Sequence, residues 1–284
     1  MMKNLVIRTL TGIIFVIVLV GGIVWSPLTM GVLFVLITAL SVWEFTGLVN
    51  QQAAVTVNRM ISTVAAVYLF MAFWAYSSGM VPTMGVFVPY LLSLMYMLVS
   101  ELYQERDHSV NNWAFTMFGQ VYVALPFSLL PTLAFMSNPI YPAEVNYRWI
   151  FPLMLFVLLW CSDTGAYCVG SLLSKKIPYR LFPSVSPHKS WVGSIGGGVL
   201  ALIVAALVAQ WDNSLTLAQW LGFALVVVVF GTWGDLVESL LKRQLGIKDS
   251  GNILPGHGGM LDRFDSSLMA IPATVVYLYT LMML

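Results

Sequence analysis

The sequence predicts an all-α polytopic membrane protein with about nine transmembrane helices, its N-terminus in the cytoplasm and its C-terminus outside. Hydrophobic residues make up 59% of the chain and charged residues only 9%, whereas about 25% of the residues of an ordinary soluble domain are charged. The mean hydropathy is +0.86, and the apolar residues gather in long segments. Nearly all Lys and Arg residues fall in alternate loops between these segments, as in multi-pass membrane proteins.

Each transmembrane helix needs about 20 mainly apolar residues to cross a hydrocarbon core of roughly 30 Å. Nine segments qualify, of which the third is the weakest because it is short and ends at a Ser-Ser-Gly turn. Lys3 and Arg8 flank the start of the first segment, which lacks a small-residue cleavage pattern, so we interpret it as a retained span. The predicted spans are 5–25, 28–49, 60–76, 81–102, 113–136, 149–170, 191–210, 217–233 and 264–284.

The basic residues predict the orientation, since cytoplasmic loops carry an excess of Lys and Arg. With nine spans, every Lys and Arg falls on one side except Arg148. An error of one span before the last loops would scatter these residues over both faces, so the pattern supports the count as well. No internal repeat or linker divides the chain, and we predict a single integral membrane domain over residues 1–284.

Acidic residues are predicted to gather at the cytoplasmic boundary. Each helical residue advances about 1.5 Å, so Glu44, Asp163 and Asp235 lie late in spans that run inward. Asp262 and Asp265 open the last span on the same side. Acids from four helices therefore reach a similar depth, which predicts a site that is accessible from the cytosol.

The stretch 235–265 is unlike the rest of the chain, because nine of the 25 charged residues occur within its 31 positions. An uncompensated charge between two apolar segments is costly, so this concentration implies a function. We therefore expect the C-terminal half, about 150–284, to carry a cytoplasm-facing active site.

The two helix ends in this stretch predict a metal site. Asp235, Glu238 and Lys242 are spaced i, i+3, i+7 and share one helix face. Asp262 and Asp265 have a similar spacing at the start of the last span. Mg²⁺ is usually held by one or two carboxylates together with substrate phosphates. We predict that Asp235 and Asp262 bind Mg²⁺, and leave a second cation open.

The segment between these helix ends predicts phosphate binding. Glycine has no Cβ, so the backbone N–H groups of Gly258 and Gly259 can approach phosphate oxygens closely. We assign His257 to the site because it stands in a Gly-His-Gly-Gly run between two acidic helices. The side chains expected to neutralise the remaining phosphate charge are Lys242, Arg243, Lys248 and Arg263.

A second polar cluster precedes the seventh span. The sequence SPHKSW at 186–191 and the sequence SDTGAY at 162–167 are both predicted to face the cytoplasm, so both are candidates for the same pocket. We interpret Arg180, like Lys175 and Lys176, as a topology determinant or lipid contact outside the site. Glu44 lies near a helix end, and the sequence favours a carboxylate that reaches water over a residue of the site.

These residues resemble the signature of CDP-diacylglycerol synthases, also called phosphatidate cytidylyltransferases. The run 239–265, SLLKRQLGIKDSGNILPGHGGMLDRFD, fills every fixed position of that signature, and SDTGAY and SPHKSW are similar to further family motifs. The chain departs from the family at His188, Ser190 and Val192, where Lys or Gly, Thr, and an acid are more common. In the family, the aspartates at the positions of Asp235 and Asp262 hold Mg²⁺.

The resemblance implies transfer of the cytidylyl group from CTP to phosphatidate, giving CDP-diacylglycerol and pyrophosphate at the cytoplasmic side of a bacterial inner membrane. It also implies a homodimer. The catalytic residues implied are Asp235, Lys248, Asp249 and Asp262. The substrate-binding residues implied are Asp163, Ser186, Lys189, Lys242, Arg243, His257, Gly258, Gly259, Arg263 and Asp265.

Two other functions remain open at this point. A cation-coupled transporter also places charges in its spans, but it should place them near the midplane with access from both sides. A membrane transferase that joins another nucleotide-activated group to a lipid phosphate would share Mg²⁺ and aspartates, so the specific signature alone argues against it. The net charge of +1 gives no sign of a nucleic-acid partner, for which a basic footprint is expected.

Overall fold

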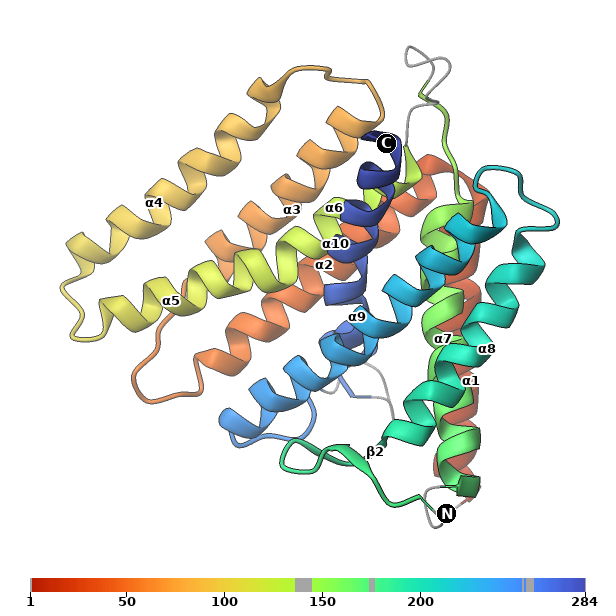
Figure 1. Ribbon diagram of the computed structural model, residues 1–284. Helices are drawn as coiled ribbons and strands as arrows, with labels where there is room; N and C mark the ends of the chain where they lie inside the picture. Colours follow the sequence, from red (N-terminus) through yellow and green to blue (C-terminus); the bar gives the residue numbers. More distant parts are fainter. Residues whose placement is uncertain (1, 136–144, 174–176, 252, 254–257, 284) are drawn as a thin grey trace. The chain divides into compact units, whose positions relative to one another are not determined.

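The computed structural model describes residues 2–135, 145–173, 177–251, 253 and 258–283, and these residues are almost entirely helical (Figure 1). The helices are α1 (Met2–Trp25), α2 (Pro27–Val49), α3 (Arg59–Ser77), η1 (Met84–Phe87), α4 (Val88–Gln104), α5 (Ser109–Gly119), η2 (Gln120–Ala124), α6 (Leu125–Ala134), α7 (Ile150–Leu173), α8 (Trp191–Val208), α9 (Leu217–Gln244) and α10 (Leu261–Met283). Two short strands, β1 (Arg180–Phe182) and β2 (Ser186–Ser190), form an antiparallel hairpin between α7 and α8.

The predicted spans are confirmed as helices. In the described part of the chain, eight helical segments are long and apolar enough to cross a membrane, and the shorter apolar segment Thr9–Trp25 of α1 corresponds to the first predicted span. The fourth span consists of η1 and α4, and the fifth of α5, the π-helical η2 and α6. The all-α polytopic membrane fold is therefore confirmed, while the orientation of the termini stays a prediction.

Helix α9 continues well beyond the span predicted at 217–233. Its additional turns carry Asp235, Glu238 and Lys242 on one unbroken helix, as their spacing predicts. Lys242 and Arg243 stand in its last turn, where positive charge is favourable beside the negative end of the helix dipole. The acidic and basic residues of this stretch are therefore presented by a rigid element.

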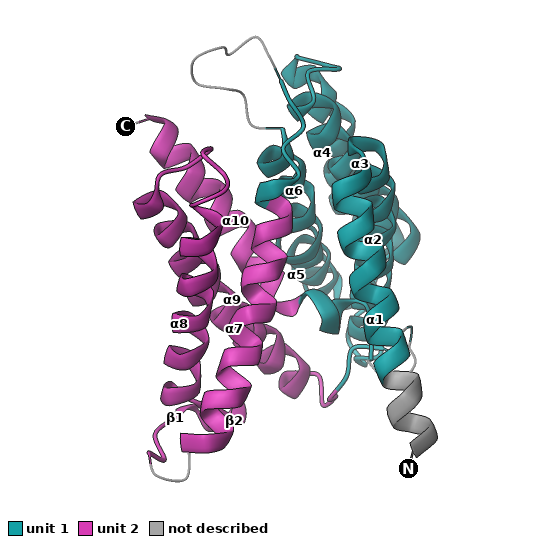
Figure 2. Cartoon of the chain, turned by 90° about the vertical axis from the view of Figure 1, so that its right-hand side faces the viewer, with its two compact units in different colours: residues 1–151, 249–264 teal, residues 152–248, 265–284 magenta. Residues whose placement is uncertain are grey.

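The described chain packs as two compact units (Figure 2). Unit 1 consists of residues 1–151 and 249–264, and unit 2 of residues 152–248 and 265–284. Helix α10 contributes its first turn to unit 1 and its remainder to unit 2. The expectation of a single membrane domain stays a prediction.

Phe264, in the first turn of α10, belongs to the core of unit 1. Its ring meets those of Phe15, Phe34 and Phe127 edge to face, with ring centroids 5.7, 6.4 and 5.4 Å apart. Such pairs contribute about 0.5–1.5 kcal/mol each beyond the area that they bury. Because Phe34 lies on α2 and Phe127 on α6, the first turn of α10, which carries Asp262, is anchored to these helices.

In unit 2, α7 and α8 lie side by side and approach closely through small residues (Figures 1 and 2). A Cβ at Gly165 would lie 2.9 Å from the Cα atom of Gly197 and 3.0 Å from the carbonyl oxygen of Gly196. Small residues allow this kind of close backbone approach between membrane helices, where van der Waals packing drives association. The interface therefore depends on glycine at these positions.

Replacing Gly197 with Ala is expected to lower the free energy of unfolding by about 1–3 kcal/mol, the usual effect of overpacking. The new Cβ would overlap the carbonyl oxygen of Ser162 and lie 3.1 Å from its hydroxyl oxygen. Gly198→Ala is the matched control, since its Cβ would meet Val228 at an ordinary 3.6 Å. Thermal midpoints in detergent should fall for the first variant only, and equal midpoints would contradict the packing argument.

Candidate active site

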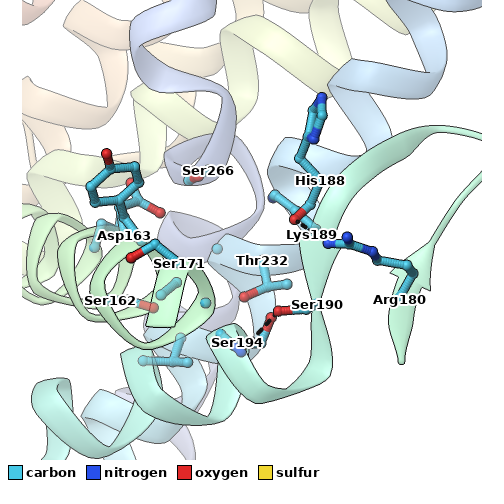
Figure 3. Close-up of a pocket in the computed structure, with 17 residues that line it drawn as sticks. Ser162, Asp163, Ser171, Arg180, His188, Lys189, Ser190, Ser194, Thr232 and Ser266 are labelled. Carbon is cyan, nitrogen blue, oxygen red and sulfur yellow. Dashed lines mark hydrogen bonds between the residues drawn. The ribbon is translucent and has the colours of Figure 1, made fainter. Parts of the chain in front are cut away.

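A cavity of about 510 Å³ lies within unit 2 (Figure 3). Its walls come from α7, the β1–β2 hairpin, α8, α9 and one residue of α10. Its polar lining consists of Ser162, Asp163, Tyr167, Ser171, Arg180, His188, Lys189, Ser190, Ser194, Thr232 and Ser266. Ionisable groups inside a membrane protein are costly and usually mark a binding or reaction site. The cavity therefore fits a polar ligand.

The hairpin supplies basic side chains to the cavity, with Arg180 on β1 and Lys189 on β2, whereas Asp163 comes from α7 (Figure 3). The Arg180 guanidinium donates a hydrogen bond to the backbone carbonyl of His188 at 3.3 Å, which ties the strands together. Sequence analysis kept Arg180 outside the site, and this interpretation is wrong about its location. Arg180 pairs with Ser190 in the hairpin and lines the cavity. Guanidinium and ammonium groups are the usual protein partners of phosphate.

The start of α8 fixes the position of Lys189. The next residue, Ser190, is buried and caps the helix by accepting a hydrogen bond from the backbone N–H of Gly193 at 3.1 Å. A Cβ at Gly193 would lie 2.9 Å from the carbonyl oxygen of Ala166 on α7. Glycine at this position lets α8 begin close against α7. Lys189, the residue before the N-cap, is therefore held near α7 as well.

Lys189 forms an ion pair with Asp235 of α9, and the two side chains are 27% and 26% exposed. Asp235 also accepts a hydrogen bond from the hydroxyl of Ser239 at 3.1 Å. Asp163 lies within electrostatic range of both Lys189 and Asp235. The structure therefore brings together three of the predicted site residues, Asp163, Lys189 and Asp235, within unit 2.

Asp265 joins this group from α10. It lies within electrostatic range of Asp235, Lys242 and Asp163, and its Oδ1 accepts a hydrogen bond from the backbone N–H of Ser266 at 2.6 Å. Like charges at short range disfavour one another's ionised form. An opposite charge favours the ionised form, so a cation that binds among these carboxylates would relieve their repulsion.

Asp262 lies in unit 1 and organises the segment before α10. Its side chain is buried, and its Oδ2 accepts hydrogen bonds from the backbone N–H groups of Ser250 and Gly259, both at 2.8 Å. Gly258 has φ of 85°, a left-handed conformation that is favourable for glycine and rare for other residues. The predicted residues Gly258, Gly259 and Asp262 therefore form one connected structure.

Glu44 belongs to the same part of unit 1, so the interpretation that it reaches water is wrong. Its side chain is only 7% exposed. The segment before α10 packs over this part of α2, and the Glu44 carboxylate accepts hydrogen bonds from the Ser250 hydroxyl and from the Met260 backbone N–H.

The other predicted residues with described positions do not line the cavity. Lys242 is ion-paired at 3.1 Å with Glu238, which is fully buried. Arg243 is exposed and donates a hydrogen bond to the backbone carbonyl of Ile247 at 3.4 Å. Ser186 opens β2, and Lys248, Asp249 and Arg263 are exposed. His257 lies outside the described residues.

The oxygen donors of these residues fit a hard cation. Carboxylate oxygens are the ligands that Mg²⁺ prefers, and one or two of them are enough when substrate phosphates and water complete the shell. Among the residues with described positions, no group of three or more His, Cys, Asp or Glu side chains has the arrangement of a metal site. Asp235 belongs to unit 2 and Asp262 to unit 1, so their pairing around Mg²⁺ stays a prediction.

Comparison with known proteins places the chain in a family. A sequence model of the Cytidylyltransferase family matches residues 6–281. This chain belongs to the cytidylyltransferase family. The phosphatidate cytidylyltransferase of Staphylococcus haemolyticus (strain JCSC1435) is 30% identical over 268 residues, which are 94% of this chain and 96% of that protein. The resemblance seen in the signature residues is thereby confirmed.

Other members of the cytidylyltransferase family share a shorter and more similar stretch. The phosphatidate cytidylyltransferase of Staphylococcus aureus (strain COL) is 46% identical over 121 residues, and that of Staphylococcus epidermidis (strain ATCC 35984) is 47% identical over 122 residues. In each case the match covers 42% of this chain and 45% of the relative. The matched region therefore covers less than half of the length of each of these two relatives.

Sequence analysis assigned no site role to Arg180 or Ser250 and left the role of Glu44 open. Arg180 had only a weak signal, a Pro-Ser turn between two stretches that are too short to show a strand period. Glu44 also had a signal, because an acid within an apolar span is functional more often than not. Ser250 had no signal of its own in a single sequence.

Proposed function

We propose that this protein transfers the cytidylyl group of CTP to phosphatidate, giving CDP-diacylglycerol and pyrophosphate. The observation that carries the proposal is the polar cavity of unit 2, which Arg180 and Lys189 line among helices long enough to span a membrane. The family match and the names of the relatives support the same reaction.

The proposed reaction joins two anions. A phosphate oxygen of phosphatidate attacks the α-phosphorus of CTP, the bond from that phosphorus to the bridging oxygen breaks, and pyrophosphate leaves with the electron pair. A phosphate monoester has a second pKa of about 6, so at neutral pH the nucleophile is already mostly deprotonated. The protein therefore needs no dedicated base, but it must neutralise charge and align the two substrates.

The residues of unit 2 are suited to neutralising charge. Arg180 and Lys189 would bind phosphate oxygens, and the ion pair with Asp235 fixes the position of the Lys189 ammonium. In unit 1, Gly258 and Gly259 would let phosphate oxygens come close to the backbone, while the Gly259 N–H itself is used by its hydrogen bond to Asp262. Lys242, Arg243 and Arg263, with His257, would supply further contacts to the substrates, and Lys248 and Asp249 keep the catalytic roles that the resemblance implies.

We assign Mg²⁺ to Asp235 and Asp262, and leave a second cation open. Mg²⁺ would supply, when bound, neutralisation of the charge on the phosphate oxygens. Support comes from the group of carboxylates around Asp235 and from the fixed position of Asp262 on the first turn of α10.

The same proposal locates the reaction at the cytoplasmic face of a bacterial inner membrane, with the protein as a homodimer and with no nucleic-acid partner. The distribution of Lys and Arg supports the face, and the relatives named above are bacterial. CTP would arrive from the cytosol, while phosphatidate would enter laterally with its acyl chains in the bilayer. Cross-linking in native membranes tests the dimer.

Turnover across a panel of substrates tests the proposed reaction. Purified protein in mixed micelles with Mg²⁺ should form a labelled lipid from CTP and phosphatidate. ATP, GTP and UTP, and a polyprenyl phosphate in place of phosphatidate, are the comparison substrates. Faster formation of a lipid product from another nucleotide or another lipid phosphate would overturn the assignment.

Cysteine labelling is expected to place the segment before α10 in the cytosol. Ile253 is exposed and suits a probe, whereas a Cβ at Gly259 would overlap the Glu44 carboxylate. In a background with Cys161 and Cys168 replaced by Ser, Ile253→Cys should react with an impermeant maleimide only in inside-out vesicles. Asn213→Cys, in the exposed α8–α9 loop, should react only in right-side-out vesicles. The reverse pattern would contradict the predicted orientation.

A further inference from the structure

The buried carboxylate of Glu44 has no role in the reaction as described so far. Glu44 lies on α2, in the N-terminal half of the chain, and its side chain is 7% exposed. Its Oε2 accepts a hydrogen bond from the Met260 backbone N–H at 2.7 Å, and its Oε1 accepts one from the Ser250 hydroxyl. Burial of a carboxylate is very costly unless such donors satisfy it. The two hydrogen bonds therefore compensate for the burial of Glu44.

Glu44 and Asp262 hold the same segment from two sides. Asp262 accepts the backbone N–H groups of Ser250 and Gly259. In return, the Ser250 hydroxyl accepts a hydrogen bond from the Asp262 backbone N–H at 3.3 Å. Ser250 therefore links the two carboxylates. Through these bonds both described ends of the segment 250–260 are fixed to α2 and to the first turn of α10.

The glycines of this segment make room for the Glu44 carboxylate. A Cβ at Gly251 would lie 2.8 Å from Glu44 Oε1 and 2.9 Å from Glu44 Cδ. A Cβ at Gly259 would overlap the same carboxylate and the Ser250 hydroxyl. Two positions before α10 therefore need glycine because Glu44 occupies the space that a side chain would take.

We infer that Glu44 is a positioning residue for the proposed reaction: it fixes the segment that carries Gly258, Gly259 and Asp262, and acts on the substrates only through them. The inference rests on the proposed function. Glu44 lies on α2, outside the signature stretch 239–265, and is thereby assigned a role in positioning residues of that stretch. Hydrogen bonds to a charged partner are the stronger kind and orient what they bind, and small misplacements of reacting groups cost rate steeply.

The test compares Glu44→Gln with Glu101→Gln. Glu101 is also a buried carboxylate of unit 1, 8% exposed, and its partners are Asn112 at 2.8 Å and Arg106 at 3.5 Å, away from the segment 250–260. Per folded protein, Glu44→Gln is expected to lower kcat by roughly 10²-fold. It should also raise the Mg²⁺ concentration that gives half-maximal rate, which a mere loss of folded protein would not move. Glu101→Gln should change neither quantity.

A spectroscopic measurement reads the segment without using activity. A nitroxide attached through Ile253→Cys, in the background without native cysteines, should become more mobile when Glu44→Gln is added, and should not change with Glu101→Gln. If wild-type protein makes no CDP-lipid, the proposed function fails while this measurement still reports the hold of Glu44 on the segment. Unchanged mobility, or increased mobility with unchanged kcat, would overturn the inference, and so would equal losses in both variants.

Ser250→Ala tests the same contact from the side of the segment. It removes the hydroxyl, which is one of the two donors to the Glu44 carboxylate. The double variant Glu44→Gln, Ser250→Ala is expected to be no slower than the slower of the two single variants, because both act on one hydrogen-bonded unit. Losses that multiply would show that Glu44 acts independently of the segment and would overturn the inference. If Glu44→Gln does not fold, the inference predicts that Ser250→Ala alone still mobilises the nitroxide, and an immobile label would overturn it.

Discussion

Replacing Asp235 with Asn is expected to lower kcat/KM by roughly 10²- to 10³-fold, if a cation ligand is worth several kcal/mol in the transition state. The substitution keeps the shape of the side chain and an acceptor for the Ser239 hydroxyl, but it removes the charge that pairs with Lys189. The free energy of unfolding should fall as well, by less than the roughly 3–5 kcal/mol typical of a buried ion pair, because both side chains are about a quarter exposed. The Lys189 ammonium would then lose its ion-pair partner, and the proposed Mg²⁺ site would lose a ligand.

Asp212→Asn is the matched control for this prediction. Asp212 is also partly exposed and also accepts a hydrogen bond from a nearby hydroxyl, that of Ser214 at 2.9 Å, but it lies in the loop before α9. Steady-state rates with CTP and phosphatidate should be unchanged in this variant. If Asp235→Asn turns over as fast as Asp212→Asn, Asp235 has no part in the reaction.

The sequence predicted the membrane fold well because a bilayer leaves few options. Backbone polar groups must be satisfied within each spanning segment, so long apolar runs become helices. Within the residues that the structure describes, each of the nine predicted spans consists mainly of helix. The distribution of Lys and Arg could check the count because one missing span would have scattered these residues over both sides.

The hairpin at 180–190 was harder to predict, because its strands are only 3 and 5 residues long. Such short strands have too little period to stand out in a polar connection. Its strand pairing is what places Arg180 and Lys189 in one cavity wall. The charge of Arg180 was therefore visible in the sequence, but its position was not.

Contacts between distant segments were beyond a single sequence. The hydrogen bond between Ser250 and Glu44 joins residues 206 positions apart, and no local pattern encodes such a pairing. Gly251 and Gly259 both fit the family signature, and the sequence predicts that Gly259 helps to bind phosphate. The structure gives both of them a second physical reason, since the Glu44 carboxylate fills the space beside them.

The second large effect is expected for Asp262→Asn, which should abolish turnover, a loss of at least about 10³-fold if a cation ligand is worth several kcal/mol. Asn keeps one side-chain oxygen, which can accept the hydrogen bonds that Asp262 Oδ2 now receives from Ser250 and Gly259. The fold of the segment should therefore survive while the negative charge is lost. Asp107→Asn, an exposed acid of unit 1, is the control for loss of charge alone and should leave the rate unchanged.

Two further measurements separate the loss of charge at Asp262 from a loss of local structure. Mg²⁺ should raise the thermal midpoint of the wild-type protein and of Asp107→Asn, because a ligand that binds only the folded state stabilises it. It should raise the midpoint of Asp262→Asn less. A nitroxide attached through Ile253→Cys should stay as immobile in Asp262→Asn as in the wild type, since the backbone hydrogen bonds remain. A mobile label together with a normal response to Mg²⁺ would show that Asp262 only shapes the segment, and the metal assignment would then be wrong.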